Sequence, residues 1–308
     1  AGNLRRLLPS IRRQRGVEFE VIVVDDQSED ATAAVVEKFA AEAGDGSIRL
    51  IKSGDLPGGW TGKSYVLHNA AQAATGELLV FLDADTEFID AEGLRQLARQ
   101  YQSYKEPVVL TGFPEMRGGG QLLASLVPFT IFGFLPWYLV QWSPRASLSA
   151  LNGQCWMISA EQYERYHPHE HVRAHVLEDV EIGRYLKSEG LMPVMLDVRG
   201  ALAVYMYDSF SEAWSGFQKN AYPLAGGTPL RALTSISFFT FLFVVAPFLW
   251  PWTLAPAWGL KVLIDRYSGF PLWVSLCTPI SYVSGLFLQI DSMITHLRGR
   301  AEWKGRRV

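Results

Sequence analysis

The chain has 308 residues, of which 49% are hydrophobic and 19% are charged, and its formal net charge is −3. This length is enough for one globular domain with membrane segments, and the charged fraction is lower than soluble domains usually have. The slightly negative charge provides no basic field, so nucleic acid is not an expected partner. Cys155 and Cys277 are the only cysteines, which excludes a disulfide framework and a CxxC metal site.

The first residues predict a helix. Leu4, Leu7, Leu8 and Ile11 are spaced as on one helical face, with arginines between them. The sequence shows no initiator Met, no signal peptide and no leading strand. We therefore expect an upstream strand of the sheet to be missing from this chain.

Strands and helices alternate over residues 18–85. We expect strands at 18–24, 48–52 and 78–82, helices from 28–30 to about 44 and over 64–75, and a glycine-containing loop at 58–63. This alternation predicts an α/β fold with a mainly parallel sheet. Ligands of such sheets bind beyond the carboxyl ends of the strands, where the sequence places Asp25-Asp26 and Asp83-Ala84-Asp85.

Residues 118–144 contain no charged side chain and are long enough to span a membrane. Pro128, Pro136 and the glycines at 118–120 interrupt a straight helix. A single span here would also separate the acidic pairs on either side of it. We expect an interfacial or re-entrant segment within a catalytic domain of residues 1–228.

Two later stretches, 232–260 and 267–290, contain no Asp, Glu, Lys or Arg. Each is longer than the ~20 apolar residues that cross a bilayer. Residues 261–266 between them are expected to form a short charged turn, so residues 229–295 read as a transmembrane helical hairpin. The tail at 296–308 is basic, which places it and the α/β domain on the cytoplasmic side of the cell membrane. Buried core helices are the alternative.

The acidic motif Asp83-Ala84-Asp85 follows an apolar strand. Two carboxylates at this spacing can share a hard cation such as Mg²⁺ or Mn²⁺, which prefers oxygen ligands and commonly bridges to phosphates. A solvated acidic turn is the alternative for a bare motif, but its place at a strand end favours a metal site.

Two further segments could contact a nucleotide. Asp25 and Asp26 could accept hydrogen bonds from a base or ribose, or could only complement a helix dipole. Lys63 follows a glycine-rich loop at the start of a helix, where backbone N–H groups and an ammonium can bind a diphosphate. An ordinary strand-to-helix loop explains Lys63 equally well.

Glu178 and Asp179 begin a predicted helix. A carboxylate at this position could act as a general base on an acceptor hydroxyl. Acidic residues are also common at helix starts without any catalytic part.

The chain resembles family 2 glycosyltransferases of the GT-A fold, most closely the membrane branch that glycosylates carotenoid or hopanoid-type lipids. The segments that carry the resemblance extend over most of residues 1–222: VVDDQSEDAT (23–32), GGWTGKSYVLHNAA (58–71), GELLVFLDADTEF (76–88), LNGQCWMISAEQY (151–163), LEDVEIGRYLKSEG (177–190) and WSGFQKNAY (214–222).

The resemblance implies a role for each candidate residue. Asp25 or Asp26 would hold the nucleobase, Lys63 would approach the base or diphosphate, and Asp83 and Asp85 would hold ribose and the metal. Asp179 would be the base of an inverting displacement, with Glu178 beside it. Lys219 would contact the donor in a segment where processive relatives carry a Gln-x-x-Arg-Trp motif, and the absence of that motif argues against polymer synthesis.

The implied reaction transfers one sugar from a nucleotide-diphosphate sugar, with a UDP-sugar favoured, to a hydroxyl or carboxyl of a membrane lipid, and needs Mg²⁺ or Mn²⁺. Two rival functions remain. Asp83 could be the nucleophile of a haloacid-dehalogenase-type phosphatase, although that fold places its motif on the first strand. The chain could also be a non-catalytic membrane protein that keeps the fold for binding.

Overall fold

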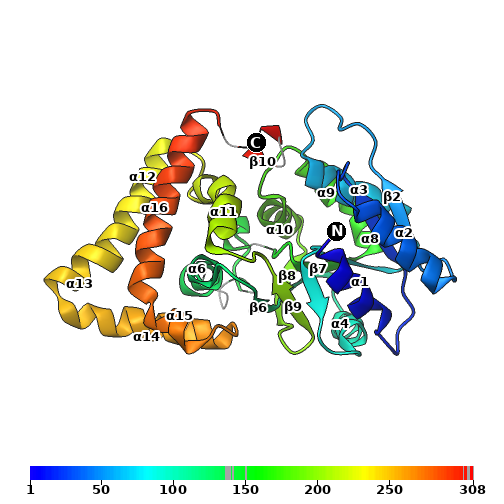
Figure 1. Cartoon of the computed structure of the whole chain (residues 1–308), viewed down its shortest axis with the longest axis horizontal. Helices are drawn as coiled ribbons and strands as arrows, with labels where there is room; N and C mark the ends of the chain where they lie inside the picture. The colour runs from blue at the N-terminus through cyan, green and yellow to red at the C-terminus, as the bar shows by residue number, and fades with distance from the viewer. Residues whose placement is uncertain (136–139, 141, 150, 301, 304–305, 308) are drawn as a thin grey trace. The chain divides into compact units, whose positions relative to one another are not determined.

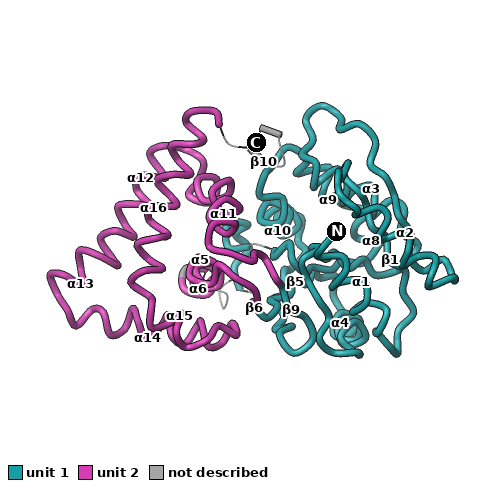
Figure 2. Tube along the Cα trace, viewed as in Figure 1, with its two compact units in different colours: residues 1–115, 137–204 teal, residues 116–136, 205–308 magenta. Residues whose placement is uncertain are grey.

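The computed structural model describes residues 1–135, 140, 142–149, 151–300, 302–303 and 306–307 (Figure 1). The chain divides into two compact units (Figure 2). Unit 1 comprises Ala1–Glu115 and Trp137–Val204, and unit 2 comprises Met116–Pro136 and Tyr205–Val308.

Unit 1 alternates helices and strands. Its elements are α1 (Leu4–Arg12), β1 (Val21–Asp25), α2 (Thr32–Ala43), β2 (Ile48–Lys52), α3 (Gly62–Ala73), β3 (Leu78–Leu82), β4 (Thr86–Phe88), α4 (Gly93–Gln102), β5 (Val108–Phe113), η1 (Ala146–Leu148), β7 (Cys155–Ser159), α8 (Ala160–Tyr166), α9 (Pro168–His171), α10 (Glu178–Ser188) and β8 (Met192–Asp197). The chain passes between the units along β6 (Glu115–Arg117) and β9 (Leu202–Tyr205).

The strands of unit 1 form separate sheets, and their pairing is mixed rather than mainly parallel. β1 and β2 pair in parallel, and a separate sheet has the order β3-β7-β5-β8. β5 and β8 are parallel, but β7 runs antiparallel to both β3 and β5. The expectation of a mainly parallel sheet was wrong because an apolar run such as residues 155–159 does not indicate the direction in which it pairs.

Side chains alternate between the two faces of the four-stranded sheet, as the period of a strand requires. In β7, Cys155 and Met157 pack in a core with α1, α2 and α4, whereas Trp156 and Ile158 pack in a second core with α3, α8 and α10. The sheet therefore lies between two helical layers, and its strand ends are positioned by a core on each face.

Several boundaries agree with the sequence. The strands at 48–52 and 78–82 are confirmed, and Glu178 begins a helix. α3 starts at Gly62, two residues earlier than expected, because the Thr61 hydroxyl caps it by accepting a hydrogen bond from the Ser64 N–H. The missing upstream strand stays a prediction.

Unit 2 consists mainly of helices: α5 (Gln121–Ala124), α6 (Leu126–Phe134), α11 (Phe210–Leu224), α12 (Pro229–Thr240), η2 (Phe241–Val245), α13 (Ala246–Leu249), η3 (Pro251–Thr253), α14 (Leu254–Tyr267), α15 (Leu272–Leu276) and α16 (Thr278–Leu297), with short strands β10 (Glu302–Trp303) and β11 (Arg306–Arg307). α16 lies beside α11 and α12 within this unit (Figure 1).

One continuous helical stretch among the described residues, Pro229–Leu249, is long and apolar enough to cross a membrane, and only 17% of its apolar window is buried. The expected charged turn at 261–266 was wrong, because Lys261 and Asp265 lie one helical turn apart within α14 and form an ion pair. Residues 136–139 and 141 of the proposed interfacial segment 118–144 lie outside the described residues.

Candidate functional site

The acidic motif at the end of β3 forms a tight turn. The main-chain oxygen of Asp83 accepts hydrogen bonds from the N–H and the hydroxyl of Thr86, at 3.1 and 2.8 Å. Thr86 is fully buried and begins β4, so the chain leaves the turn in a fixed conformation. Asp83 and Asp85 are therefore held at the carboxyl edge of the sheet, where α/β folds bind ligands.

Lys63 reaches this edge from the first turn of α3. The loop before α3 is fixed by the Thr61 N–H, which donates to the Arg173 main-chain oxygen at 2.6 Å. Lys63 Nζ lies 3.0 Å from Asp83 Oδ1 and 2.7 Å from Glu178 Oε1. One ammonium therefore connects the acidic motif of β3 to the acidic pair of α10.

The charges around Lys63 determine its protonation. Burial alone would lower the pKa of Lys63, but the carboxylates of Asp83, Glu178 and Asp179 raise that pKa well above its ordinary value. Burial raises the pKa of Glu178, which the Lys63 charge opposes and the neighbouring Asp179 supports. The side chain of Glu178 is only 8% exposed, whereas that of Lys63 is 43% exposed.

Asp179 is oriented by two backbone N–H groups. Its Oδ2 accepts a hydrogen bond from the Gly153 N–H at 2.9 Å, and its Oδ1 accepts one from the Val180 N–H at 2.8 Å. The position at the N-terminal end of α10 also favours a negative charge. The carboxylate is thus fixed in orientation while remaining only partly buried.

Asp85 has an unsatisfied hydrogen-bond acceptor within the site. Its Oδ1 is buried and has no hydrogen-bond partner among the described residues. Burial and the neighbouring Asp83 carboxylate raise the pKa of Asp85 to about 7, although Lys63 and Arg6 oppose this shift. A buried acceptor beside a second carboxylate fits a divalent cation. Among the described residues, no group of three His, Cys, Asp or Glu side chains is placed to hold a metal alone.

The remaining predicted residues belong to other elements. Asp25 is buried at the end of β1, where its Oδ1 accepts a hydrogen bond from the Ser28 N–H at 3.0 Å. Asp26 is the next residue, and Ser53 Oγ lies 3.5 Å from its Oδ1. Lys219 belongs to α11 of unit 2. The donor contacts of these three residues stay predictions.

Sequence reasoning gave no role to Asn152, Gly153 and Gln154, which form the turn before β7. This turn contacts both acidic segments, because Gly153 donates to Asp179 and the Asp83 N–H points to the Gln154 main-chain oxygen at 3.4 Å. Asn-Gly is a common turn signal, but only the pairing of β7 with β3 places it at the site. Arg6, whose charge acts on Asp85, was also missed.

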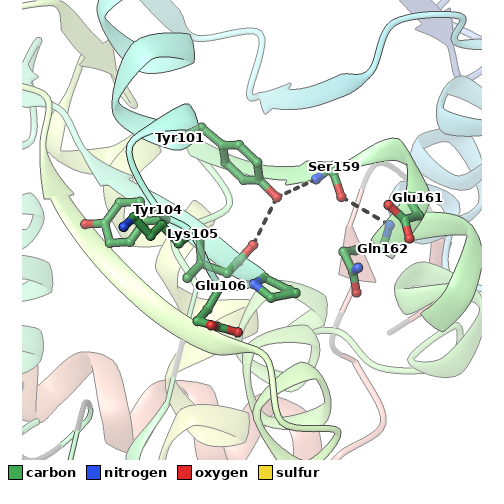
Figure 3. A pocket seen from close by; sticks show the side chains of 9 residues that line it. Tyr101, Tyr104, Lys105, Glu106, Ser159, Glu161 and Gln162 are labelled. Carbon is green, nitrogen blue, oxygen red and sulfur yellow. Dashed lines mark hydrogen bonds between the residues drawn. The ribbon is translucent and has the colours of Figure 1, made fainter.

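A pocket of about 190 Å³ lies at the opposite end of the strands from the candidate site (Figure 3). It is lined by residues that include Tyr101, Glu161 and Gln162. Ser159, which also lines the pocket, pairs with the first residue of β3, whereas the candidate site follows the last residue of that strand. The Tyr101 hydroxyl bridges the Ser159 N–H and the Val108 main-chain oxygen, which indicates a structural contact (Figure 3).

Comparison with known proteins found similar sequences. Residues 1–130 match the model of the family Glycosyl transferase family 2. The 4,4'-diaponeurosporenoate glycosyltransferase of Staphylococcus aureus strain USA300 is 25% identical over 97% of this chain and 83% of that protein. The same enzyme from strain MRSA252 is equally similar.

A solved structure supports the fold. The mannosyltransferase PcManGT from Pyrobaculum calidifontis, in complex with GDP-Man and Mn²⁺, superposes with a TM-score of 0.61 at 16% identity, over 96% of this chain and 84% of that one. Taken together, the family match over residues 1–130, which include Lys63, Asp83 and Asp85, and these likenesses show a chain with a GT-A-like fold that is similar to family 2 glycosyltransferases, among them a carotenoid-type enzyme.

Proposed function

We propose that the protein transfers a single sugar from a nucleotide-diphosphate sugar to a hydroxyl or carboxyl of a carotenoid- or hopanoid-like membrane lipid, with inversion at the anomeric carbon. The observation that carries the proposal is the ion-paired cluster in which Lys63 contacts both Asp83 and Glu178. It joins the proposed cation-binding motif to the acidic pair that contains the proposed base, Asp179. The likeness to a diaponeurosporenoate glycosyltransferase supports a lipid acceptor.

In this proposal, Asp85 and Asp83 would hold a Mg²⁺ or Mn²⁺ ion beside the diphosphate of the donor. When bound, the cation supplies positive charge against the leaving diphosphate. The buried, unpartnered Oδ1 of Asp85 supports this assignment. Lys63 contributes a second positive charge to the diphosphate, and its raised pKa keeps it protonated throughout the neutral range.

We assign nucleoside binding to Asp25 and Asp26 at the end of β1, and a further donor contact to Lys219. A UDP-sugar is the donor we favour. The neighbouring mannosyltransferase structure contains GDP-Man instead, so the test includes both nucleotides.

Asp179 is proposed as the general base. Its carboxylate accepts the proton of the acceptor hydroxyl while that oxygen attacks the anomeric carbon from the face opposite the diphosphate. General-base catalysis contributes about 100- to 10,000-fold to such reactions. The N–H groups of Gly153 and Val180 hold the carboxylate in one orientation, so little reorganisation is needed when the acceptor arrives.

We also propose that unit 2 attaches the enzyme to the cell membrane, with the catalytic domain (1–228) and the basic tail (296–308) in the cytoplasm. The two apolar stretches of 229–295 would enter the bilayer as a hairpin, and 118–144 would lie at its surface. Large apolar side chains of unit 2 are exposed, including Phe248 at 85% and Trp252 at 72%. Burial in lipid would remove this surface from water.

Transfer of labelled sugar into the lipid phase tests the proposal. Membranes containing the protein receive UDP- or GDP-hexoses, lipid extract and Mn²⁺, and the organic phase is analysed by mass spectrometry. We expect a hexosyl-lipid that depends on Mn²⁺ or Mg²⁺ and falls by about 100-fold or more in Asp179→Asn. Phosphate release without sugar transfer would support the phosphatase, and binding without turnover would support a non-catalytic protein.

A further inference from the structure

The turn Asn152–Gly153–Gln154 contacts both halves of the candidate site. Through Gly153 it donates a hydrogen bond of 2.9 Å to Asp179 Oδ2, on the helix α10. Through the Gln154 main-chain oxygen it lies 3.4 Å from the Asp83 N–H, at the end of β3. These two segments are far apart in the chain, and the turn is a direct backbone connection between them.

The turn is itself anchored to β5, one of the two inner strands of the four-stranded sheet. The Asn152 N–H donates to the Thr111 hydroxyl at 2.7 Å, and the Asn152 side-chain amide donates to the Gly112 main-chain oxygen at 3.0 Å. The same amide lies 3.2 Å from Gln154 Oε1, and Asn152 Oδ1 accepts from the Gln154 N–H at 3.2 Å. Since Thr111 is fully buried, the turn has a fixed attachment to the core.

The absence of a side chain at residue 153 permits the close contact. A Cβ added to Gly153 would lie 3.0 Å from Asp179 Oδ2 and 3.1 Å from Lys63 Nζ. Real Cβ atoms rarely approach this closely, so both neighbours would shift by a few tenths of an ångström. The backbone of Gly153 is not in the left-handed region, so glycine is not required there by conformation. Glycine at residue 153 instead leaves room for the carboxylate of Asp179.

We propose that Asn152, Gly153 and Gln154 form a positioning turn that sets the orientation of Asp179 relative to Asp83, with Thr111 as its buried anchor. The inference rests on the proposed function, since it takes Asp179 as the base. Displacement of a base reduces the rate of the chemical step, because proton transfer depends on reach and alignment. Donor binding depends on Lys63 and the acidic motif rather than on Asp179, so a change at the buried anchor Thr111 leaves it unchanged.

The first test compares Gly153→Ala with Gly200→Ala. Gly200 is exposed, and a Cβ added there meets nothing within 4 Å. We expect Gly153→Ala to lower kcat by about 10-fold, since an ångström of misplacement can cost about 100-fold, and to raise KM for the donor by a smaller factor, because the added Cβ also displaces the end of the Lys63 side chain. Gly200→Ala should match the wild type.

The second test compares two substitutions of the anchor. Thr111→Val keeps the shape but removes the hydroxyl that accepts from Asn152, and Thr111→Ser keeps that hydroxyl. We expect kcat to fall in Thr111→Val and to be restored in Thr111→Ser, at an unchanged affinity for nucleoside diphosphate measured by calorimetry with Mn²⁺.

Each outcome has one interpretation. Wild-type kcat in Gly153→Ala, or equal kcat losses in Thr111→Val and Thr111→Ser, would overturn the positioning role while leaving the enzyme's function intact. Failure of the wild-type protein to transfer sugar would instead overturn the proposed function. Loss of nucleotide affinity together with kcat in Thr111→Val would also contradict the inference, because it would show a general effect on the site.

Discussion

The ammonium nitrogen of Lys63 lies 2.7 Å from Oε1 of Glu178 and 3.0 Å from Oδ1 of Asp83. A cation therefore stands between two acidic segments that would otherwise repel each other. A diphosphate that binds here would compete with these carboxylates for Lys63, and a bound divalent cation would replace part of the charge that Lys63 provides.

Lys63→Met should destabilise the metal-free protein. Without the ammonium, the carboxylates of Asp83 and Glu178 face each other uncompensated, so we expect Tm to fall by roughly 2–4 °C, the shift that about 1 kcal/mol causes in a domain of this size. Mn²⁺ should raise Tm more in this variant than in the wild type. Thermal unfolding with and without Mn²⁺ measures both effects, with the exposed Lys105→Met as control. Equal Tm values in all three proteins would contradict the compensation.

Asp85→Asn should remove metal-supported nucleotide binding. Asparagine keeps the size of the side chain but not the charge, and hard divalent cations are bound most strongly by carboxylates. We expect the affinity for nucleoside diphosphate with Mn²⁺ to fall at least about 10-fold, to the level of the wild type in EDTA. Calorimetry measures this, and Glu161→Gln in the remote pocket should bind like the wild type. Unchanged binding in Asp85→Asn would exclude Asp85 as a ligand.

Stability should depend on pH through His169. Burial, together with the charges of His68 and Lys63, lowers the pKa of His169 to about 3. The unfolded chain then takes up a proton near pH 6.5 that the folded protein does not, so this part of the stability is complete above pH 6.5 and is lost as pH falls toward 3. Between pH 7.5 and pH 5, the free energy of unfolding should therefore fall by about 2 kcal/mol.

Denaturant unfolding at several pH values tests this prediction. His169→Gln should remove that part of the pH dependence, although it also changes the hydrogen bond of 2.8 Å between the Tyr163 hydroxyl and Nδ1. Tyr163→Phe breaks the same bond but keeps the histidine, so it should lose stability and keep the pH dependence. The same slope in wild type and His169→Gln would refute the assignment.

The ion pair inside unit 2 predicts a non-additive response. Lys261 and Asp265 have fully buried side chains, and Lys261 also donates to Ser125 Oγ at 2.9 Å, while Ser275 donates to Asp265 at 3.0 Å. Lys261→Met alone leaves a buried carboxylate without its cation, which costs about 3–5 kcal/mol. Lys261→Met combined with Asp265→Leu should recover most of that loss. Thermal unfolding in detergent compares the variants, and additive losses would contradict the pairing.

Local patterns in the sequence were sufficient to locate the two strongest site segments. Five apolar residues followed by Asp83-Ala84-Asp85 identify both the strand and its carboxyl end, and the acidic pair at 178–179 matches the start of α10. Such patterns depend only on neighbours in the chain, so a single sequence contains them in full.

The rest of the site depends on contacts between distant segments. Nothing near Gly153 in the sequence indicates that β7 pairs antiparallel with β3 and thereby brings residue 153 to Asp179. The expectation of a charged turn at 261–266 was wrong for a related reason. The buried Lys261 has a hydrogen-bond partner in Ser125, so a helix with charged residues is tolerated in an apolar unit. Contacts between distant segments of the chain therefore determine both the position of Gly153 and the helical conformation of residues 261–266.

The most direct measurement is the location of Mn²⁺ by anomalous scattering in crystals grown with a nucleoside diphosphate. The proposed site predicts one peak in contact with the carboxylate of Asp85, with the diphosphate on the same side as Lys63 and Asp179. Mn²⁺ and nucleotide bound together at another edge of the sheet, away from Asp85 and Asp179, would contradict it.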